Sequence, residues 1–169
     1  MDRTTIGAAA LVAALCLPLT ACAPAVSGEP VTLTIGTDDS PGVPSAAQIE
    51  QFAKEVDELS DGRITIEPVW GAAGSGISDW DQAIAAMAID GELDLALVPS
   101  RSWDALGVTT LRPLNAPFLI DSDALVEEVL TSDLPTTMMA GLADAGVEGI
   151  GMWPEGLRQA NPIPGMIAL

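Results

Sequence analysis

The chain has 169 residues, of which 49% are hydrophobic, and this is enough for one domain with an apolar core. Six basic residues stand against 24 acidic ones, and the formal net charge of −18 argues against nucleic acid and anionic membrane surfaces as partners. Histidine is absent, which excludes a Ser-His-Asp or Cys-His catalytic set and histidine-ligated metal, and the two cysteines lack zinc-binding spacing. The sequence therefore predicts neither a metal site nor a cofactor.

The N-terminus has the pattern of a bacterial lipoprotein signal. Arg3 precedes an apolar run from Ile6 to Leu17 that is too short to span a membrane, and Leu19-Thr-Ala-Cys22 follows this run. The pattern predicts a signal peptide over residues 1–21, a lipid on the thiol of Cys22, and a short tether over residues 22–30. An ordinary secretory signal in which Cys22 is incidental is the alternative. We expect the mature chain to be extracytoplasmic and anchored to the cell membrane.

The first half of the mature chain predicts strand, helix and strand. Residues from Val31 to Ile35 alternate as a strand does, and a polar loop that contains Asp38 follows them. Ser45–Leu59 repeats apolar residues at three- to four-residue spacing, which predicts a helix with Gly62 as its C-terminal cap. Arg63–Val69 alternates again and predicts a second strand.

A second helix and a third strand are predicted next. Asp79 and Gln82 suggest a capping pair for this helix, and Gly91 suggests its end. Its apolar residues fall at helical spacing: Trp80, Ile84, Met87 and Ala88. Leu93–Val98 is almost continuously apolar, as in a strand that is covered on both faces. A strand–helix–strand order of this length implies a right-handed crossover between parallel strands, and ligands bind at the carboxyl ends of such strands.

The rest of the chain predicts an irregular stretch, two helices and a fourth strand. Residues 101–114 are mixed, with Leu106 and Leu111 expected to pack inward. The helices are predicted over residues 122–130 and 135–145, and the fourth strand over Val147–Trp153. Glycines near that strand mimic a dinucleotide fingerprint, but no helix follows them. The glycine-rich turn over residues 71–77 lacks the Gly-Lys-Ser/Thr of a phosphate loop. We expect no nucleotide.

Three motifs carry a family resemblance. They are Ser60-Asp-Gly-Arg-Ile-Thr-Ile, Asp90-Gly-Glu-Leu-Asp-Leu and Ala116-Pro-Phe-Leu, and with their spacing they resemble DctP-type solute-binding proteins of TRAP transporters. The resemblance implies an α/β fold that is periplasmic-binding-protein-like (type II), with a mainly parallel sheet flanked by helices. It implies a first lobe over residues 31–154, with residues 155–169 as the start of a hinge and second lobe. We expect the chain to be truncated there, because it lacks the family's later Asp-Leu-x-Gly-x-Lys-x-Arg motif.

The resemblance also implies a ligand site. Arg158, in Glu155-Gly-Leu-Arg-Gln, resembles the family's Gly-x-Arg segment, whose arginine contacts an acidic ligand. A guanidinium suits this role because its fork matches a carboxylate with two parallel hydrogen bonds. The alternative for Arg158 is an exposed residue paired with one of the many acids.

Four more residues are candidates for this site. Asp38 falls where the family has a polar loop residue, and Asp81 falls where the family often has a ligand-contacting side chain. Asp81 would alternatively stabilise the N-terminus of its helix. Any contact after the third strand passes to Ser100, because Pro99 has no N–H donor. Trp70 either lines the cleft or fills the core.

The resemblance predicts an extracytoplasmic solute-binding component of a TRAP transporter, which captures a small organic acid and delivers it to the membrane permease subunits. Sugar acids, dicarboxylates and 2-oxo acids all remain open as ligands. The alternative is a lipid-anchored surface protein with a structural or interaction role, or a truncated product without function. An enzyme would have to rest on carboxylates alone, such as Asp79 and Asp81, as glycosidases do, so we expect none.

Overall fold

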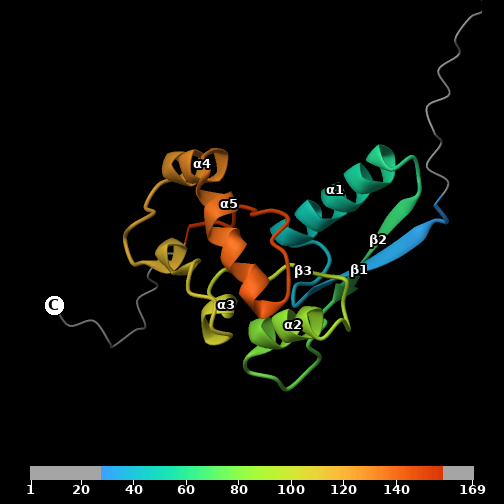
Figure 1. Cartoon of the computed structure of the whole chain (residues 1–169), viewed down its shortest axis with the longest axis horizontal. Coiled ribbons are helices and arrows are strands. Elements are labelled where there is room, and N and C mark those ends of the chain that lie inside the picture. The colour runs from blue at the N-terminus through green and yellow to red at the C-terminus, as the bar shows by residue number, and fades with distance from the viewer. Residues whose placement is uncertain (1–27, 158–169) are drawn as a thin grey trace, which may run out of the picture.

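The computed structural model describes residues 28–157. Strands β1 (Val31–Thr37), β2 (Ile64–Trp70) and β3 (Leu95–Ala96) form one parallel sheet in the order β2-β1-β3 (Figure 1). The first strand of the chain is therefore the central one, with a partner on each edge. The predicted α/β class and mainly parallel sheet are confirmed.

Helix α1 (Pro44–Leu59) connects β1 to β2 and packs on the sheet through an apolar cluster. Ile49 is fully buried in this cluster against Ile35 and Ile66 of the two strands. The helix ends in a left-handed turn at Asp61 (φ 54°), and the N–H of Gly62 donates to the carbonyl of Asp57 at 2.9 Å. Gly62 therefore caps the C-terminus of α1 through this hydrogen bond, as predicted, and the left-handed turn begins one residue earlier, at Asp61.

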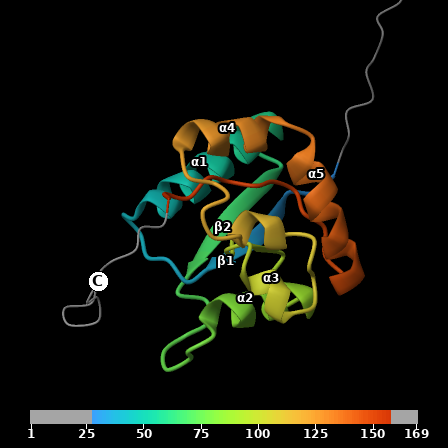
Figure 2. The same ribbon diagram turned by 90° about the vertical axis from the view of Figure 1, so that its left-hand side faces the viewer.

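Helix α2 (Trp80–Ile89) connects β2 to β3, and Figures 1 and 2 show it on the side of the sheet opposite α1. Gly91 (φ 76°) terminates it as predicted. The predicted capping pair is wrong, because the Asp79 side chain accepts no hydrogen bond from the helix. Its backbone (φ −108°, ψ 46°) departs from the extended conformation in which an N-cap side chain reaches back to the first turn.

The second half of the described chain is helical. Its elements are α3 (Ser102–Ala105), the 3₁₀ helix η1 (Arg112–Asn115), α4 (Asp123–Thr131), α5 (Leu134–Met139) and the 3₁₀ helix η2 (Ala140–Ala145). The two predicted helices are confirmed, although the second tightens to 3₁₀ geometry after Met139. A second buried cluster joins α2 to this half: Ala85, Trp103, Val108, Leu111 and Leu142. Leu106 packs against it as predicted, whereas α3 and η1 replace the expected irregular stretch.

The fourth predicted strand is wrong, and the third is shorter than predicted. Residues 147–153 join no sheet, and β3 pairs with β1 only through Leu95 and Ala96. Val147 and Met152 pack on the second cluster and Trp153 packs on the first, so the apolar pattern reflects burial against helices rather than strand pairing. No helix within residues 28–157 is long and apolar enough to cross a membrane.

Candidate functional site

The loops that leave the three strands begin side by side at the carboxyl edge of the sheet. After β2, the N–H of Ala72 donates to the carbonyl of Thr37 at 2.9 Å. After β3, the N–H of Leu97 donates to the carbonyl of Gly36, also at 2.9 Å. These hydrogen bonds hold the loops that follow β2 and β3 against the end of β1, at the edge where parallel sheets bind ligands.

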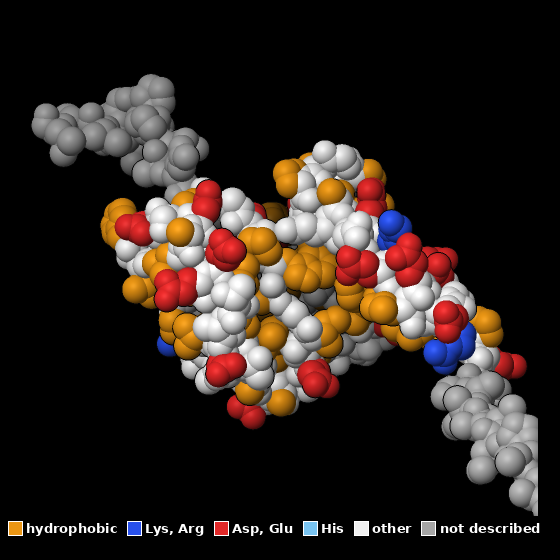
Figure 3. Space-filling view, turned by 90° about the horizontal axis from the view of Figure 1, so that it is seen from above, with side chains coloured by type: hydrophobic (Ala, Val, Ile, Leu, Met, Phe, Trp, Pro, Cys, Tyr) orange, Lys and Arg blue, Asp and Glu red, His pale blue; other side chains and the backbone are white. Residues whose placement is uncertain are grey.

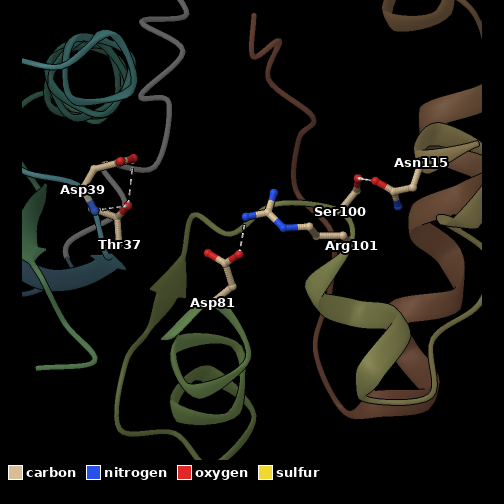
Figure 4. Close-up of polar contacts among 6 residues, drawn as sticks. All are labelled: Thr37, Asp39, Asp81, Ser100, Arg101 and Asn115. Atoms are coloured by element: carbon tan, nitrogen blue, oxygen red, sulfur yellow. Dashed lines mark hydrogen bonds and ion pairs between the residues drawn. The ribbon is translucent and has the colours of Figure 1, made fainter. Parts of the chain in front are cut away.

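An ion pair lies at this edge. Asp81, in the first turn of α2, is 6% exposed, and its Oδ2 accepts a hydrogen bond from Nη2 of Arg101 at 2.5 Å (Figure 4). The N-terminus of α2 and the guanidinium both stabilise the negative charge of the carboxylate. The Arg101 side chain, which directly precedes α3, is 39% exposed. A buried anion therefore holds a cation that still reaches solvent.

Polar groups lie on both sides of this ion pair in Figure 4. On one side, the hydroxyl of Thr37, a residue that is only 2% exposed, donates to Oδ2 of Asp39 at 3.3 Å and accepts from the backbone N–H of Asp39 at 3.3 Å. On the other side, the hydroxyl of Ser100 donates to Oδ1 of Asn115 at 3.1 Å. The edge thus offers a cation to an anionic group, and hydroxyls, carboxylates and an amide to the polar groups of a small molecule.

The structure brings two of the predicted site residues, Asp81 and Ser100, to this edge. Asp38 lies half-buried in the loop after β1, but it is the next residue, Asp39, that contacts Thr37. Trp70 packs against the cluster of Ile35, Ile49 and Ile66, so its contacts are those of a core residue. Cys22 and Arg158 lie outside the described residues.

Sequence reasoning missed Arg101. The available signal was a basic residue immediately after Ser100, at the end of a predicted strand, in a chain with six basic and 24 acidic residues. The partner that gives Arg101 its position, Asp81, is 20 residues away in sequence, and no local pattern links the two residues.

Metal chemistry has no support within residues 28–157. No group of three or more acidic or cysteine side chains is placed to hold a metal ion in that part of the chain. Ser102 is notable for a different reason, because it is fully buried and its hydroxyl has no hydrogen-bond partner among the described residues.

Two shallow grooves lie elsewhere, on the face that carries α1 and α4, where apolar side chains gather between acidic ones (Figure 3). The first has a volume of about 420 Å³ and runs between α1 and the segment after residue 151, where Phe52 and Trp153 place their ring centroids 5.4 Å apart. The second, of about 410 Å³, runs between α4 and the same segment. Among the described residues that line the two grooves, none is a predicted site residue, and both grooves are lined mainly by apolar surface.

A parallel sheet whose carboxyl edge gathers a cation, carboxylates and hydroxyls is the architecture of a ligand-binding α/β lobe. Comparison with known sequences defines the class further. The sequence model of the DctP family, described as the bacterial extracellular solute-binding proteins of family 7, matches residues 35–162. The chain belongs to this family, which is one of solute-binding proteins and not of enzymes.

Individual relatives are more distant. The uncharacterized protein y4mM of Sinorhizobium fredii (strain NBRC 101917 / NGR234) is 30% identical over 156 residues, which cover 92% of this chain and 28% of the relative. A TRAP periplasmic solute-binding protein from Ochrobactrum anthropi, with its C-terminus bound in the ligand-binding pocket, is 22% identical with a TM-score of 0.63. The sugar acid binding protein DctPAm from Advenella mimigardefordensis, in complex with galactonate, is 20% identical with a TM-score of 0.61.

These two structural matches establish the fold alone and cover only part of each solved protein. They span 73% of this chain in both cases, but 37% of the Ochrobactrum protein and 38% of the Advenella protein. The chain therefore corresponds to little more than a third of the length of these relatives.

Proposed function

We propose that this protein is the extracytoplasmic solute-binding component of a TRAP-type transport system, and that it captures a small organic acid for delivery to the membrane permease subunits. The observation that carries the proposal is the coincidence of a DctP match over residues 35–162 with a polar carboxyl edge built around Asp81 and Arg101. The Arg101 guanidinium at that edge is 39% exposed, so it can still donate hydrogen bonds to a carboxylate of the ligand.

The described lobe supplies one side of the proposed binding site. On this side, Asp81, Ser100 and the loop that contains Asp38 and Asp39 are proposed to contact the ligand. Arg158, which follows the last described residue, is proposed to add a second basic group. In solute-binding proteins a second lobe closes over the ligand, and closure excludes water from the site.

We further propose that a lipid on Cys22 anchors the protein to the cell membrane and that residues 22–30 act as the tether. Two or more acyl chains provide stable anchoring where one does not. The intact mass of the native protein from its own membranes tests this directly. A lipid increment that disappears in a Cys22→Ser variant supports the anchor, and an unmodified mass refutes it.

An interaction role is the second candidate function, and exposed apolar side chains favour it. Phe118 is 96% exposed with a left-handed backbone (φ 61°), Leu119 is 55% exposed and Ile150 is 67% exposed. A non-glycine residue with this backbone is uncommon and is retained where its surroundings require it. An adjoining lobe or a partner protein would cover such side chains.

Ligand titration of the purified chain, followed by NMR, separates the two functions. The probes are galactonate, succinate and pyruvate, with the neutral polyol galactitol as the control for galactonate. Saturable shifts of Thr37, Asp81 and Ser100 with a carboxylate, and none with galactitol, are expected. The absence of saturable shifts with all three carboxylates, or equal shifts with galactitol, would overturn the proposed function and leave the interaction role.

A further inference from the structure

We propose that Arg101 binds the carboxylate of the ligand and that Asp81 is the residue that positions it. This inference rests on the proposed function, because it assigns the charge-recognising group of that same site. The sequence pattern predicts neither of these two roles. Arg101 belongs to no motif, and the position of Asp81 in the first turn of α2 is already accounted for by stabilisation of the helix N-terminus.

The location of the basic residues singles out Arg101. Residues 28–157 contain four basic residues, and two of them, Lys54 on the exposed side of α1 and Arg63 before β2, lie away from the carboxyl edge. Arg112, in η1, forms an exposed ion pair with Asp104. Arg101 is the one that follows the carboxyl end of a strand, five residues after β3 ends.

Asp81 restricts the orientation of the Arg101 guanidinium. The carboxylate is fixed on α2 and its side chain is only 8% exposed, so it provides a rigid acceptor for Nη2 of Arg101. A guanidinium has five N–H donors in a planar fork, and one of them, on Nη2, donates to Asp81. The 39% of the side chain that remains exposed leaves donors for a second carboxylate, in a geometry that is set before the ligand arrives.

The pair formed by Arg112 and Asp104 shows that pairing alone does not create such a site. The two side chains are 60% and 42% exposed, so solvent competes for both partners and neither is held by burial. Arg112 therefore provides a matched control, with the same side chain, the same kind of partner and the same charge, but without a buried anchor.

The test is galactonate affinity, measured by NMR titration of the full chain for wild type, Arg101→Ala, Arg101→Lys and Arg112→Ala. Arg101→Ala is expected to weaken binding by about tenfold or more, the effect of losing a charge-assisted hydrogen bond. Arg101→Lys keeps the charge but loses the planar fork, so it is expected to weaken binding by about three- to tenfold. Arg112→Ala is expected to stay within about twofold of wild type, since an exposed ion pair contributes little.

The positioning role of Asp81 is tested by the NMR signal of the Arg101 side chain rather than by the stability of the fold. In Asp81→Asn, the Nη–H signals of Arg101, whose Nη2 donates to Asp81, are expected to broaden and to exchange faster with water, while the Nε–H signal of Arg112 stays unchanged. A general loss of structure would alter both arginine signals. An unchanged Arg101 signal would remove Asp81 as its positioning residue.

The outcomes separate this inference from the proposed function. If wild type binds galactonate and both Arg101 variants bind it within about twofold, the assignment of Arg101 is wrong while the function stands. An equal loss of galactonate affinity in Arg112→Ala would mean that binding depends on bulk charge, which also overturns the assignment of Arg101. If wild type binds no carboxylate, the proposed function itself fails. Thermal unfolding of each variant identifies one that does not fold, and Arg101→Lys then decides the question.

Discussion

Gly149 lies where the segment of residues 147–157 packs closely on α5 and η2. A Cβ atom at this position would be 2.6 Å from Cβ of Met139 and 2.9 Å from Cδ1 of Leu142. The Met139 Cβ is fixed to the backbone of α5, so rotation of a side chain does not relieve the contact. In Gly149→Ala, we expect the segment to move away from α5.

The magnitude follows from two opposing effects. Adding a methyl group to a packed contact of this kind typically destabilises by about 1–3 kcal/mol. Replacing glycine also reduces the entropy of the unfolded chain, which stabilises by about 0.4–1 kcal/mol. The expected net loss is about 1–2 kcal/mol in the free energy of unfolding, or roughly 2–8 °C in the melting temperature.

Gly151 is the matched control, since it lies two residues further along the same segment. Its added Cβ would meet Nε1 of Trp153 at 3.5 Å, an ordinary contact distance. Gly151→Ala is therefore expected to be neutral or to stabilise by up to about 1 kcal/mol. Urea unfolding monitored by tryptophan fluorescence and by circular dichroism gives both values under the same conditions.

Equal stability of the two variants would refute the reasoning. It would mean that residues 147–157 do not pack on α5 as described, and the explanation for the missing fourth strand would fall with that contact. A loss in Gly149→Ala alone would confirm that close packing on a helix, rather than strand pairing, selects glycine there.

Two further predictions concern single polar side chains. The carboxylate of Asp94 accepts hydrogen bonds from the backbone N–H of Thr34 at 2.8 Å and from its hydroxyl at 2.9 Å, and these bonds lower the pKa of Asp94 below its usual 3.8. A carboxylate whose pKa is lower in the folded protein than in the unfolded chain stabilises the fold at pH values above the unfolded-state pKa, and this stability is lost as the pH falls through the folded-state pKa. Asp94→Asn should therefore be less stable than wild type at pH 7, and the difference should shrink below about pH 4. A constant difference across urea curves from pH 2.5 to 7 would contradict this. Ser102→Ala should raise the free energy of unfolding by about 1 kcal/mol, because it removes a buried hydroxyl without a partner. As the control, Ser60→Ala should lower the free energy of unfolding by about 1 kcal/mol, because the Ser60 hydroxyl accepts a hydrogen bond from the N–H of Ile64 at 2.9 Å. A loss of stability in both serine variants would show that the Ser102 hydroxyl has a hydrogen-bond partner in solution.

The elements that the sequence predicted well are those fixed by nearby residues. Helix α1 carries its apolar residues at helical spacing, and the turn at Gly62 closes it through hydrogen bonds that span five residues. In β1 and β2, Leu33, Ile35, Ile64 and Ile66 alternate with other residues because these four side chains face the cluster under α1. Gly91 marked the end of α2 correctly, because the turn that ends a helix also depends on neighbouring residues alone.

The elements that were predicted wrongly depend on distant parts of the chain. Val147–Trp153 has the apolar pattern of a strand, but a strand also needs a neighbouring backbone, and the segment packs instead on side chains of α5 and η2. Asp79 has the residue type of a helix cap, but its backbone angles are set by the loop after β2. An apolar pattern reports that a face is buried and does not say what buries it.

By itself, the sequence determined the α/β class, the order of the first three strands and two helices, and the family resemblance, and it predicted Asp81 and Ser100 as residues of a site. Only the tertiary structure decided that Arg101 reaches Asp81 across 20 residues, and that the loops after β2 and β3 meet the end of β1. The physical reason is that helical and strand periodicities arise between near neighbours, whereas a binding edge forms only when the crossover through α2 brings β3 beside β1.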